Sequence, residues 1–230
     1  MDIIKRLKGK VIVSVQAMPN EPLYHETCMS AMMKSVVKGG AGALRVAGVR
    51  DVKCAKSLFD IPIIGITKPD VIPKNYKEIV YITPTVEDCI SLINAGADII
   101  AFDGTSRNRP NNCKLEEIIK FIQLNKKVSM ADISTYKEGV NCANLGVDIL
   151  STTLSGYTVE SDSQSETPDF DLLEKLVKET NIPVILEGRI WEPDDVKRAF
   201  ELGAHAVVIG SAITRPQLIT KRFIQKGVVV

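Results

Sequence analysis

Histidine is scarce in this sequence, and the cysteines are not grouped. The two histidines, His25 and His205, are too few and too far apart for a metal cluster. The five cysteines are odd in number and form no C-x-x-C motif, so neither a disulfide framework nor a structural zinc site fits. Small buried or half-buried hydrophobic side chains are the simpler interpretation of Cys28, Cys54, Cys89, Cys113 and Cys142.

Long apolar runs and an excess of one charge are lacking as well. The formal net charge of +1 leaves no long basic face for a nucleic acid or a membrane surface. No apolar run approaches the roughly 20 residues of a membrane helix. Residues 1–8 are charged and helical in pattern, without the apolar centre and cleavage site of a signal peptide. We therefore expect a cytoplasmic protein with a short N-terminal helix and no nucleic-acid or membrane partner.

The chain instead holds eight short apolar runs, most of which end in a polar residue. Continuous apolarity is typical of strands buried on both faces, as in a parallel sheet, and helical patterns separate the runs. The phrases Asn94-Ala-Gly-Ala-Asp98 and Asn144-Leu-Gly-Val-Asp148 repeat the order of helix end, glycine and strand start. Eight such units favour an α/β fold, a (β/α)8 TIM barrel, over a doubly wound sheet. At 230 residues the chain suits one domain, residues 1–230.

Polar residues at the strand ends predict the functional site, because the chemistry of such barrels lies at the C-terminal ends of the strands. The run 184–186 is the clearest case, since it ends in Glu187 and a glycine follows at once. Three carboxylates could hold magnesium, but cations share the same rim, so we expect no metal. Asp103 could instead pair with Arg45 or Arg107. The residues expected at this mouth are Gln16, Arg45, Lys68, Asp103, Asp132, Glu187 and Arg215.

Glycines follow the seventh and eighth strands. Gly188 and the run 210–216 stand where barrel enzymes often hold phosphate through backbone N–H groups at the start of a short helix. Glycine also ends strands for packing reasons, and Arg215 could cap a helix instead. Pro216, which follows Arg215, favours a rigid turn, so we expect a phosphate site at the ends of the seventh and eighth strands.

Lys68 ends a run that is otherwise apolar. It could form a structural ion pair with Glu187 or Asp132, or act as a general acid/base or a Schiff-base former. Burial and a nearby Arg45 would favour the neutral amine, whereas a close Glu187 would keep the amine charged. The residues alone leave this balance open.

The local structure of several segments between the strands can also be predicted. Residues 79–82 could form a short extra strand within an irregular segment, and residues 23–38 read as a helix. Ser134 is the expected N-cap of the next helix after the fifth strand, with Lys137 where a capping box would place an acid. Residues 155–168 are the most polar stretch and are expected to form a surface loop.

Several motifs together resemble one enzyme family. They are Val13-Ser-Val-Gln16-Ala, Pro62-Ile-Ile-Gly-Ile-Thr-Lys68, Met130-Ala-Asp132-Ile-Ser-Thr135, Ser151-Thr-Thr-Leu-Ser-Gly-Tyr157-Thr, Glu187-Gly-Arg-Ile and Ala212-Ile-Thr-Arg-Pro216. In this order, from the first strand to the last helix, they look like the bacterial N-acetylmannosamine-6-phosphate 2-epimerases. The resemblance implies a ribulose-phosphate-binding type of TIM barrel. It also implies interconversion of N-acetylmannosamine 6-phosphate and N-acetylglucosamine 6-phosphate in sialic acid catabolism, without a cofactor.

The resemblance also implies roles for individual residues. Lys68 and Glu187 would be the catalytic acid/base pair. The sequence departs from the family at Pro69, where an arginine is usual, and at Ser211, where a second glycine is usual. The implied sugar-binding residues are Gln16, Arg45, Asp132, Tyr157 and Arg215, and the implied phosphate-binding residues are Gly188, Gly210 and Ser211.

Two other functions and the oligomeric state stay open at this point. A Schiff-base aldolase would bond Lys68 covalently to a carbonyl substrate. A catalytically silent sensor would bind a phosphosugar and exchange no C2 proton, but it would need neither Lys68 nor Glu187. Exposed aliphatic residues within 213–224 hint at a homodimer, although core packing explains them equally well.

Overall fold

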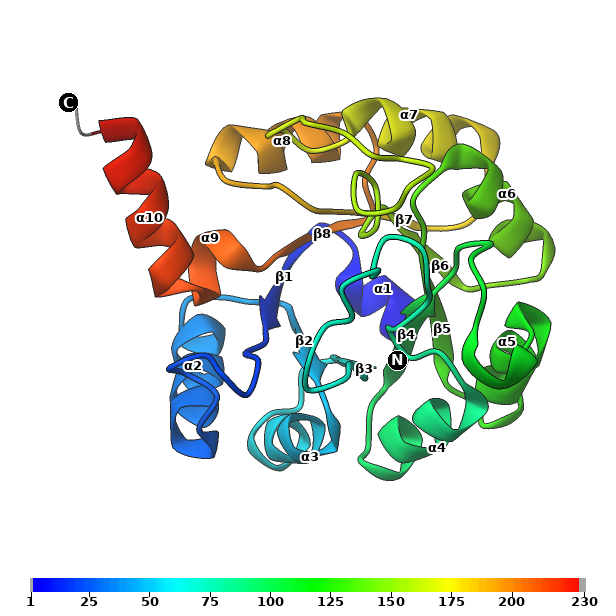
Figure 1. The fold of residues 1–230 in the computed structure, drawn as a ribbon, viewed down its shortest axis with the longest axis horizontal. Helices are drawn as coiled ribbons and strands as arrows, with labels where there is room; N and C mark the ends of the chain where they lie inside the picture. The colour runs from blue at the N-terminus through cyan, green and yellow to red at the C-terminus, as the bar shows by residue number, and fades with distance from the viewer. Residues whose placement is uncertain (1, 228–230) are drawn as a thin grey trace.

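Eight parallel strands close into a barrel in the computed structural model, which describes residues 2–227. The strands pair in chain order, and the last pairs with the first, so the predicted (β/α)8 TIM barrel is confirmed (Figure 1). The strands are β1 (Lys10–Val15), β2 (Ala43–Ala47), β3 (Ile63–Ile66), β4 (Ile99–Asp103), β5 (Val128–Asp132), β6 (Ile149–Ser151), β7 (Val184–Glu187) and β8 (Ala206–Ile209).

A helix follows each strand and packs on the outside of the barrel or at its rim (Figure 1). The described helices are α1 (Ile3–Leu7), α2 (Glu26–Lys38), α3 (Val49–Leu58), α4 (Val86–Asn94), α5 (Leu115–Leu124), α6 (Tyr136–Asn144), α7 (Phe170–Glu179), α8 (Pro193–Glu201), α9 (Ser211–Thr214) and α10 (Pro216–Gly227), with one 3-10 turn η1 (Pro110–Asn112).

Strand residues alternate between two cores. Because successive side chains in a strand point to opposite faces, every second residue points into the barrel. The inner core holds Ile12, Ile64, Ile99 and Ile185, with Leu7 of α1 fully buried against them. The outer core joins the other strand faces to the helices. This double burial explains why the strands read as continuous apolar runs.

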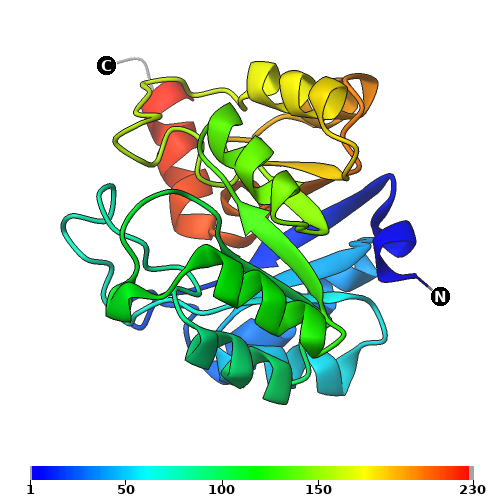
Figure 2. The ribbon, with the colours of Figure 1, turned by 90° about the vertical axis from the view of Figure 1, so that its right-hand side faces the viewer.

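Helix α1 and the long connections lie at opposite ends of the barrel. Figure 2 shows α1 on one side of the molecule and the segments after β3 and β6 on the other. These two segments touch, since Val159 N donates to Lys77 O at 3.3 Å and the Lys77 ammonium lies 2.7 Å from the Asp162 carboxylate. Together they build up the rim at the C-terminal ends of the strands.

Three local expectations were wrong. Thr135, not Ser134, is the N-cap of α6, and Glu138 completes a capping box with it. The acid therefore stands one position later than the Ser134 prediction requires. Residues 79–82 form no strand, because Ile79 makes only an isolated bridge to Asn108. Helix α2 begins at Glu26 rather than residue 23.

Candidate active site

The alternation of side chains along each strand brings the polar residues at the strand ends together at the mouth of the barrel. Ile64 and Ile66 belong to the inner core, and Lys68 follows them in the same two-residue step. Ile185 and Glu187 stand in the same relation at β7. Apolar side chains fill the interior of the barrel. The next inward-pointing residue of each strand therefore lies at the mouth of the barrel.

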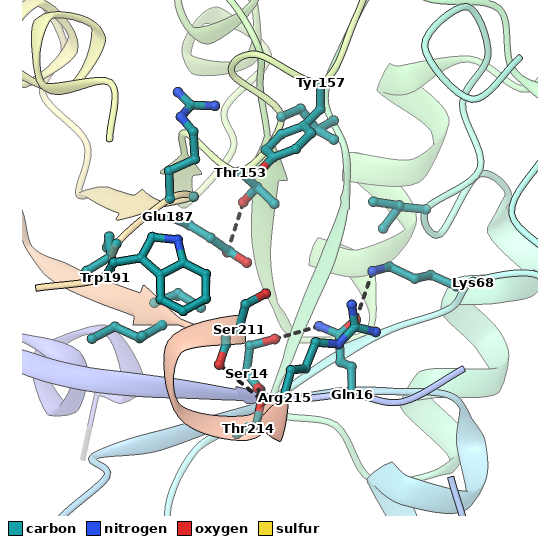
Figure 3. A pocket seen from close by; sticks show the side chains of 18 of the residues that line it. Ser14, Gln16, Lys68, Thr153, Tyr157, Glu187, Trp191, Ser211, Thr214 and Arg215 are labelled. Carbon is teal, nitrogen blue, oxygen red and sulfur yellow. Dashed lines mark hydrogen bonds between the residues drawn. The ribbon is translucent and has the colours of Figure 1, made fainter. Parts of the chain in front are cut away.

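A cavity of about 370 Å³ lies at this mouth (Figure 3). Its volume is in the range of small-molecule sites. Eight of the ten residues that the family resemblance implies line it: Gln16, Lys68, Tyr157, Glu187, Gly188, Gly210, Ser211 and Arg215. The other two, Arg45 and Asp132, are buried and reach the cavity through Glu187 and Thr153, which both line it.

Lys68 is held by a neutral partner. Its Nζ donates to Gln16 Oε1 at 2.8 Å, and Gln16 Nε2 donates to Ser14 Oγ at 2.7 Å. Burial, followed by the positive charge of Arg45, lowers the pKa of Lys68 to about 8, although Glu187 opposes the shift. Of the opposing effects that the residues alone left open, burial and Arg45 therefore outweigh Glu187, and a fraction of the amine is neutral near pH 7. Pro69 does not turn Lys68 away from the cavity.

Arg45 joins the two carboxylates beneath the cavity. Its Nη1 and Nη2 donate to Asp132 Oδ1 and Oδ2 at 2.9 and 2.5 Å, and Nη1 lies 3.0 Å from Glu187 Oε2. Burial disfavours the charged guanidinium, but Asp132 and Glu187 outweigh that effect and raise the pKa of Arg45. Burial raises the pKa of Glu187, against a lowering by Arg45. Three charged groups thus share one buried network.

Lys68 and Glu187 face each other across the cavity rather than pairing. Figure 3 shows the two side chains entering from different sides. Among the ion pairs of residues 2–227, none joins Lys68 to Glu187. A substrate in the space between them would therefore meet an amine on one side and a carboxyl group on the other.

Thr153 is the main site residue that the sequence reasoning missed. Its hydroxyl contacts both Asp132 and Glu187. A signal was available, because Ile149 lies in the inner core and Ser151 and Thr153 follow it in steps of two. Thr153 lies two residues beyond β6, where the inward face reaches the cavity.

The ends of β7 and β8 form the second wall of the cavity. Gly188 has φ +105°, a conformation that side chains rarely adopt, and it turns the chain after Glu187. Gly210 precedes the short helix α9, which Ser211 begins. Arg215 Nη2 lies 2.6 Å from Glu21 Oε2 and also lines the cavity. These groups stand where the sequence predicts phosphate binding.

Aromatic residues complete the rim. Tyr157 was predicted at the site, whereas Tyr81 and Trp191 were not. The guanidinium of Arg189 lies 5.7 Å from the Tyr157 ring centre, and that of Arg222 lies 4.8 Å from the Trp191 ring centre. Both aromatic rings are thus held against arginines at the edge of the cavity.

Asp103 belongs to a separate buried network. It forms an ion pair with Arg107, one of the two partners expected for it, and its carboxylate also accepts from Thr105. Arg107 in turn donates to Tyr76 O at 2.8 Å. This network ties the connection after β4 to the connection after β3.

Within residues 2–227, no group of three or more histidine, cysteine, aspartate or glutamate residues is arranged to hold a metal ion. In the same range, no helix has the length and apolarity to cross a membrane.

Comparisons with known proteins agree on one family. Residues 29–228 match the family model described as putative N-acetylmannosamine-6-phosphate epimerase. A protein of Clostridioides difficile named putative N-acetylmannosamine-6-phosphate 2-epimerase is 47% identical over 97% of this chain and 98% of its own length. The solved structure of the N-acetylmannosamine-6-phosphate 2-epimerase from Clostridium perfringens superimposes with a TM-score of 0.92 at 44% identity, covering 98% of this chain and 96% of that one.

A more distant likeness concerns the fold alone. Thiamine phosphate pyrophosphorylase from Pyrococcus furiosus has a TM-score of 0.62 at 17% identity, over 96% of this chain and 93% of that one. The match of the family model and the identity to full-length relatives settle the family. The chain belongs to the N-acetylmannosamine-6-phosphate epimerase family.

Proposed function

We propose that this chain interconverts N-acetylmannosamine 6-phosphate and N-acetylglucosamine 6-phosphate, by removing and returning the proton at C2 of the open-chain sugar. Such an enzyme would serve the breakdown of sialic acids, in the cytoplasm. The observation that carries the proposal is the pair of Lys68, with its pKa lowered to about 8, and Glu187, across one cavity.

The chemistry requires few groups. Inversion at C2 needs the sugar ring to open, because only the C1 aldehyde makes the C2 proton acidic. The enzyme must then supply a base at C2, an acid or cation for the developing enolate oxygen, and a clamp for the phosphate. The aldehyde itself accepts the electron pair of the broken C–H bond, so no organic cofactor or metal is required.

Lys68 is our candidate for the base at C2. Its lowered pKa leaves part of the amine neutral near pH 7, and the hydrogen bond to Gln16 holds Nζ in place. Glu187 would assist ring opening or serve the opposite face of C2. Its raised pKa suits a carboxyl group that both gives and takes a proton.

The remaining predicted residues have supporting roles in this proposal. Backbone N–H groups of Gly188, Gly210 and Ser211 would bind the phosphate, helped by the Arg215 charge. Gln16 and Tyr157 would contact the sugar from the cavity wall. Arg45 and Asp132 are predicted substrate-binding residues; from their buried positions they would act on the sugar through Glu187 and Thr153.

We also propose that the chain forms a homodimer through α10. Figure 1 shows α10 extending away from the barrel, and none of its described residues is buried. Phe223 is 73% and Ile224 57% exposed, which is unfavourable for apolar side chains unless a second copy covers them. Light scattering on the protein and on the F223E variant would test this: a monomeric wild-type protein would contradict it.

Incubation with N-acetylmannosamine 6-phosphate in deuterated water tests the proposed reaction. Proton NMR should show N-acetylglucosamine 6-phosphate carrying deuterium at C2, and the Lys68→Ala variant should lose the exchange. Lys197→Ala, on the outer surface, is the matched control and should retain it. Bound phosphosugar without exchange would contradict the proposal, and a borohydride-trapped adduct on Lys68 would indicate an aldolase instead.

A further inference from the structure

One hydroxyl group lies between two carboxylates at the floor of the cavity. Thr153 Oγ1 is 2.7 Å from Asp132 Oδ1 and 2.9 Å from Glu187 Oε2, and Ser151 Oγ lies 2.8 Å away. A threonine hydroxyl has a single hydrogen, and an ionised carboxylate only accepts. Thr153 can therefore donate to one of the two carboxylates at a time.

Asp132 is the carboxylate that Arg45 binds through both oxygens. Its side chain is fully buried, and both of its oxygens accept from the two Nη groups of Arg45. Both oxygens of Asp132 thus take part in charge-assisted hydrogen bonds to one guanidinium. Loss of the Thr153 hydrogen bond would still leave Asp132 satisfied.

Glu187 is the carboxylate that can change its charge. Its side chain is 14% exposed and lines the cavity, so it can exchange a proton with a ligand there. Oε2 faces Arg45 and Thr153, while Oε1 has no hydrogen-bond partner among residues 2–227. The charged groups facing Glu187 are Arg45 from β2, Asp132 from β5 and Lys68 beyond β3.

We propose that Thr153 is a positioning residue whose hydrogen switches from Asp132 to Glu187 when Glu187 ionises. With Glu187 neutral, its proton lies on Oε1, towards the cavity, and Thr153 donates to Asp132. When the proton passes to a sugar oxygen, negative charge develops on Glu187. Thr153 then rotates its O–H towards Oε2, and both steps reverse when the proton returns. Thr153 neither gains nor loses a proton.

The proposal rests on the proposed epimerase function only for the identity of the proton acceptor. Its physical content is that the Thr153 hydroxyl stabilises the ionised form of Glu187. A hydrogen bond to the charged form of an acid lowers its pKa, so removal of the hydroxyl should raise the pKa of Glu187. Thr152 provides a matched control, since its hydroxyl contacts the backbone N–H and C=O of Glu187 instead of the carboxyl group.

Infrared difference spectroscopy on protein with ¹³C-labelled glutamate would follow the protonation of Glu187 without turnover. The Glu187→Gln variant identifies its carboxyl band. In Thr153→Val the pH midpoint of the titration of this band should rise by about one pH unit. This is the size expected for one hydrogen bond to a charged group. Thr153→Ser should restore the wild-type midpoint, and Thr152→Val should keep it.

Each outcome decides the proposal. An unchanged midpoint in Thr153→Val, or an equal shift in Thr152→Val, would overturn it. Should Thr153→Val fail to fold, Thr153→Ala removes the same hydroxyl at the half-buried position and gives the same test. Absence of C2 exchange in the wild-type protein would contradict the epimerase function, whereas the infrared shift would still show that the Thr153 hydroxyl stabilises ionised Glu187.

Discussion

The Lys68 ammonium group donates to the amide oxygen of Gln16 at 2.8 Å, although the carboxyl group of Glu187 lines the same cavity. A neutral acceptor fixes the direction of the amine without cancelling the effect of burial on its pKa. A carboxylate at the same distance would hold the lysine charged. The pairing with Gln16 is therefore what leaves Lys68 available as a base.

The pH dependence of the reaction should report Lys68. Only the neutral amine can remove a proton, so kcat/KM should rise with pH and level off near the Lys68 pKa of about 8, instead of the ordinary 10.5. At one pH unit below that value about a tenth of the amine is neutral. Measurement above about pH 7 avoids the titration of the substrate phosphate. An apparent pKa near 10.5 in the dependence of kcat/KM on pH would contradict the role of Lys68 as the base.

The Gln16→Glu variant should raise the pH at which kcat/KM levels off. A carboxylate 2.8 Å from Nζ in a buried site favours the ammonium form, so the pKa of Lys68 should rise by at least about one unit. At pH 7 the variant should lose about tenfold in kcat/KM and recover as the pH is raised. Gln16→Leu is the control: it removes the hydrogen bond without adding charge, so its loss of activity should not recover at high pH.

The barrel and most of its mouth could be predicted because both follow from short-range patterns. Continuous apolar runs mark strands buried on two faces, and the polar residue after each run marks its C-terminal end. Lys68 and Glu187 stand out for this reason. Thr153 does not, because threonine is ordinary at strand ends and its importance comes only from Asp132 and Glu187, on other strands.

Positions that depend on packing between connections could not be predicted. Tyr81 reaches the cavity from an irregular segment, which the bond from Arg107 to Tyr76 O helps to hold. Trp191 lies against Arg222, which comes much later in the chain. The capping error had a different cause: Ser134 and Thr135 are both good caps, and only the position of Glu138 decides between them.

Removal of Arg45 should destabilise the protein strongly. Arg45 is 1% exposed and pairs with Asp132 and Glu187, so Arg45→Met would leave two buried carboxylates without a cation. Breaking such a network costs about 3–5 kcal/mol in the free energy of unfolding. Urea denaturation would measure the loss, and the further change Asp132→Asn should restore part of it. A loss below about 1 kcal/mol would contradict this account.

An exposed ion pair gives the matching control for Arg45. Lys178 and Glu174 on α7 are 66% and 42% exposed, at 2.7 Å. Water screens such a pair, so Lys178→Ala should change the free energy of unfolding by at most about 0.5 kcal/mol. The contrast between the two variants would separate the effect of burial from the loss of a positive charge.

Arg189 should control the loop that carries Tyr157. Its Nε donates to Thr167 O at 2.7 Å and its Nη1 to Ser155 O at 2.5 Å, so one side chain joins the two ends of the polar loop. Arg189→Met should free this loop, expose it to limited proteolysis and withdraw Tyr157 from the cavity wall. We expect KM to rise about tenfold, equivalent to 1.4 kcal/mol of binding, with a smaller change in kcat because Lys68 is untouched.

Arg198 allows the effect of the loop to be separated from the loss of an arginine nearby. Its guanidinium lies 4.2 Å from the Phe170 ring centre, and no bond from Arg198 to a loop carbonyl occurs among residues 2–227. Arg198→Met should therefore leave both KM and the proteolysis pattern close to those of the wild type. An equal rise of KM in the two variants would mean that general positive charge, and not the bridge between Ser155 and Thr167, attracts the substrate.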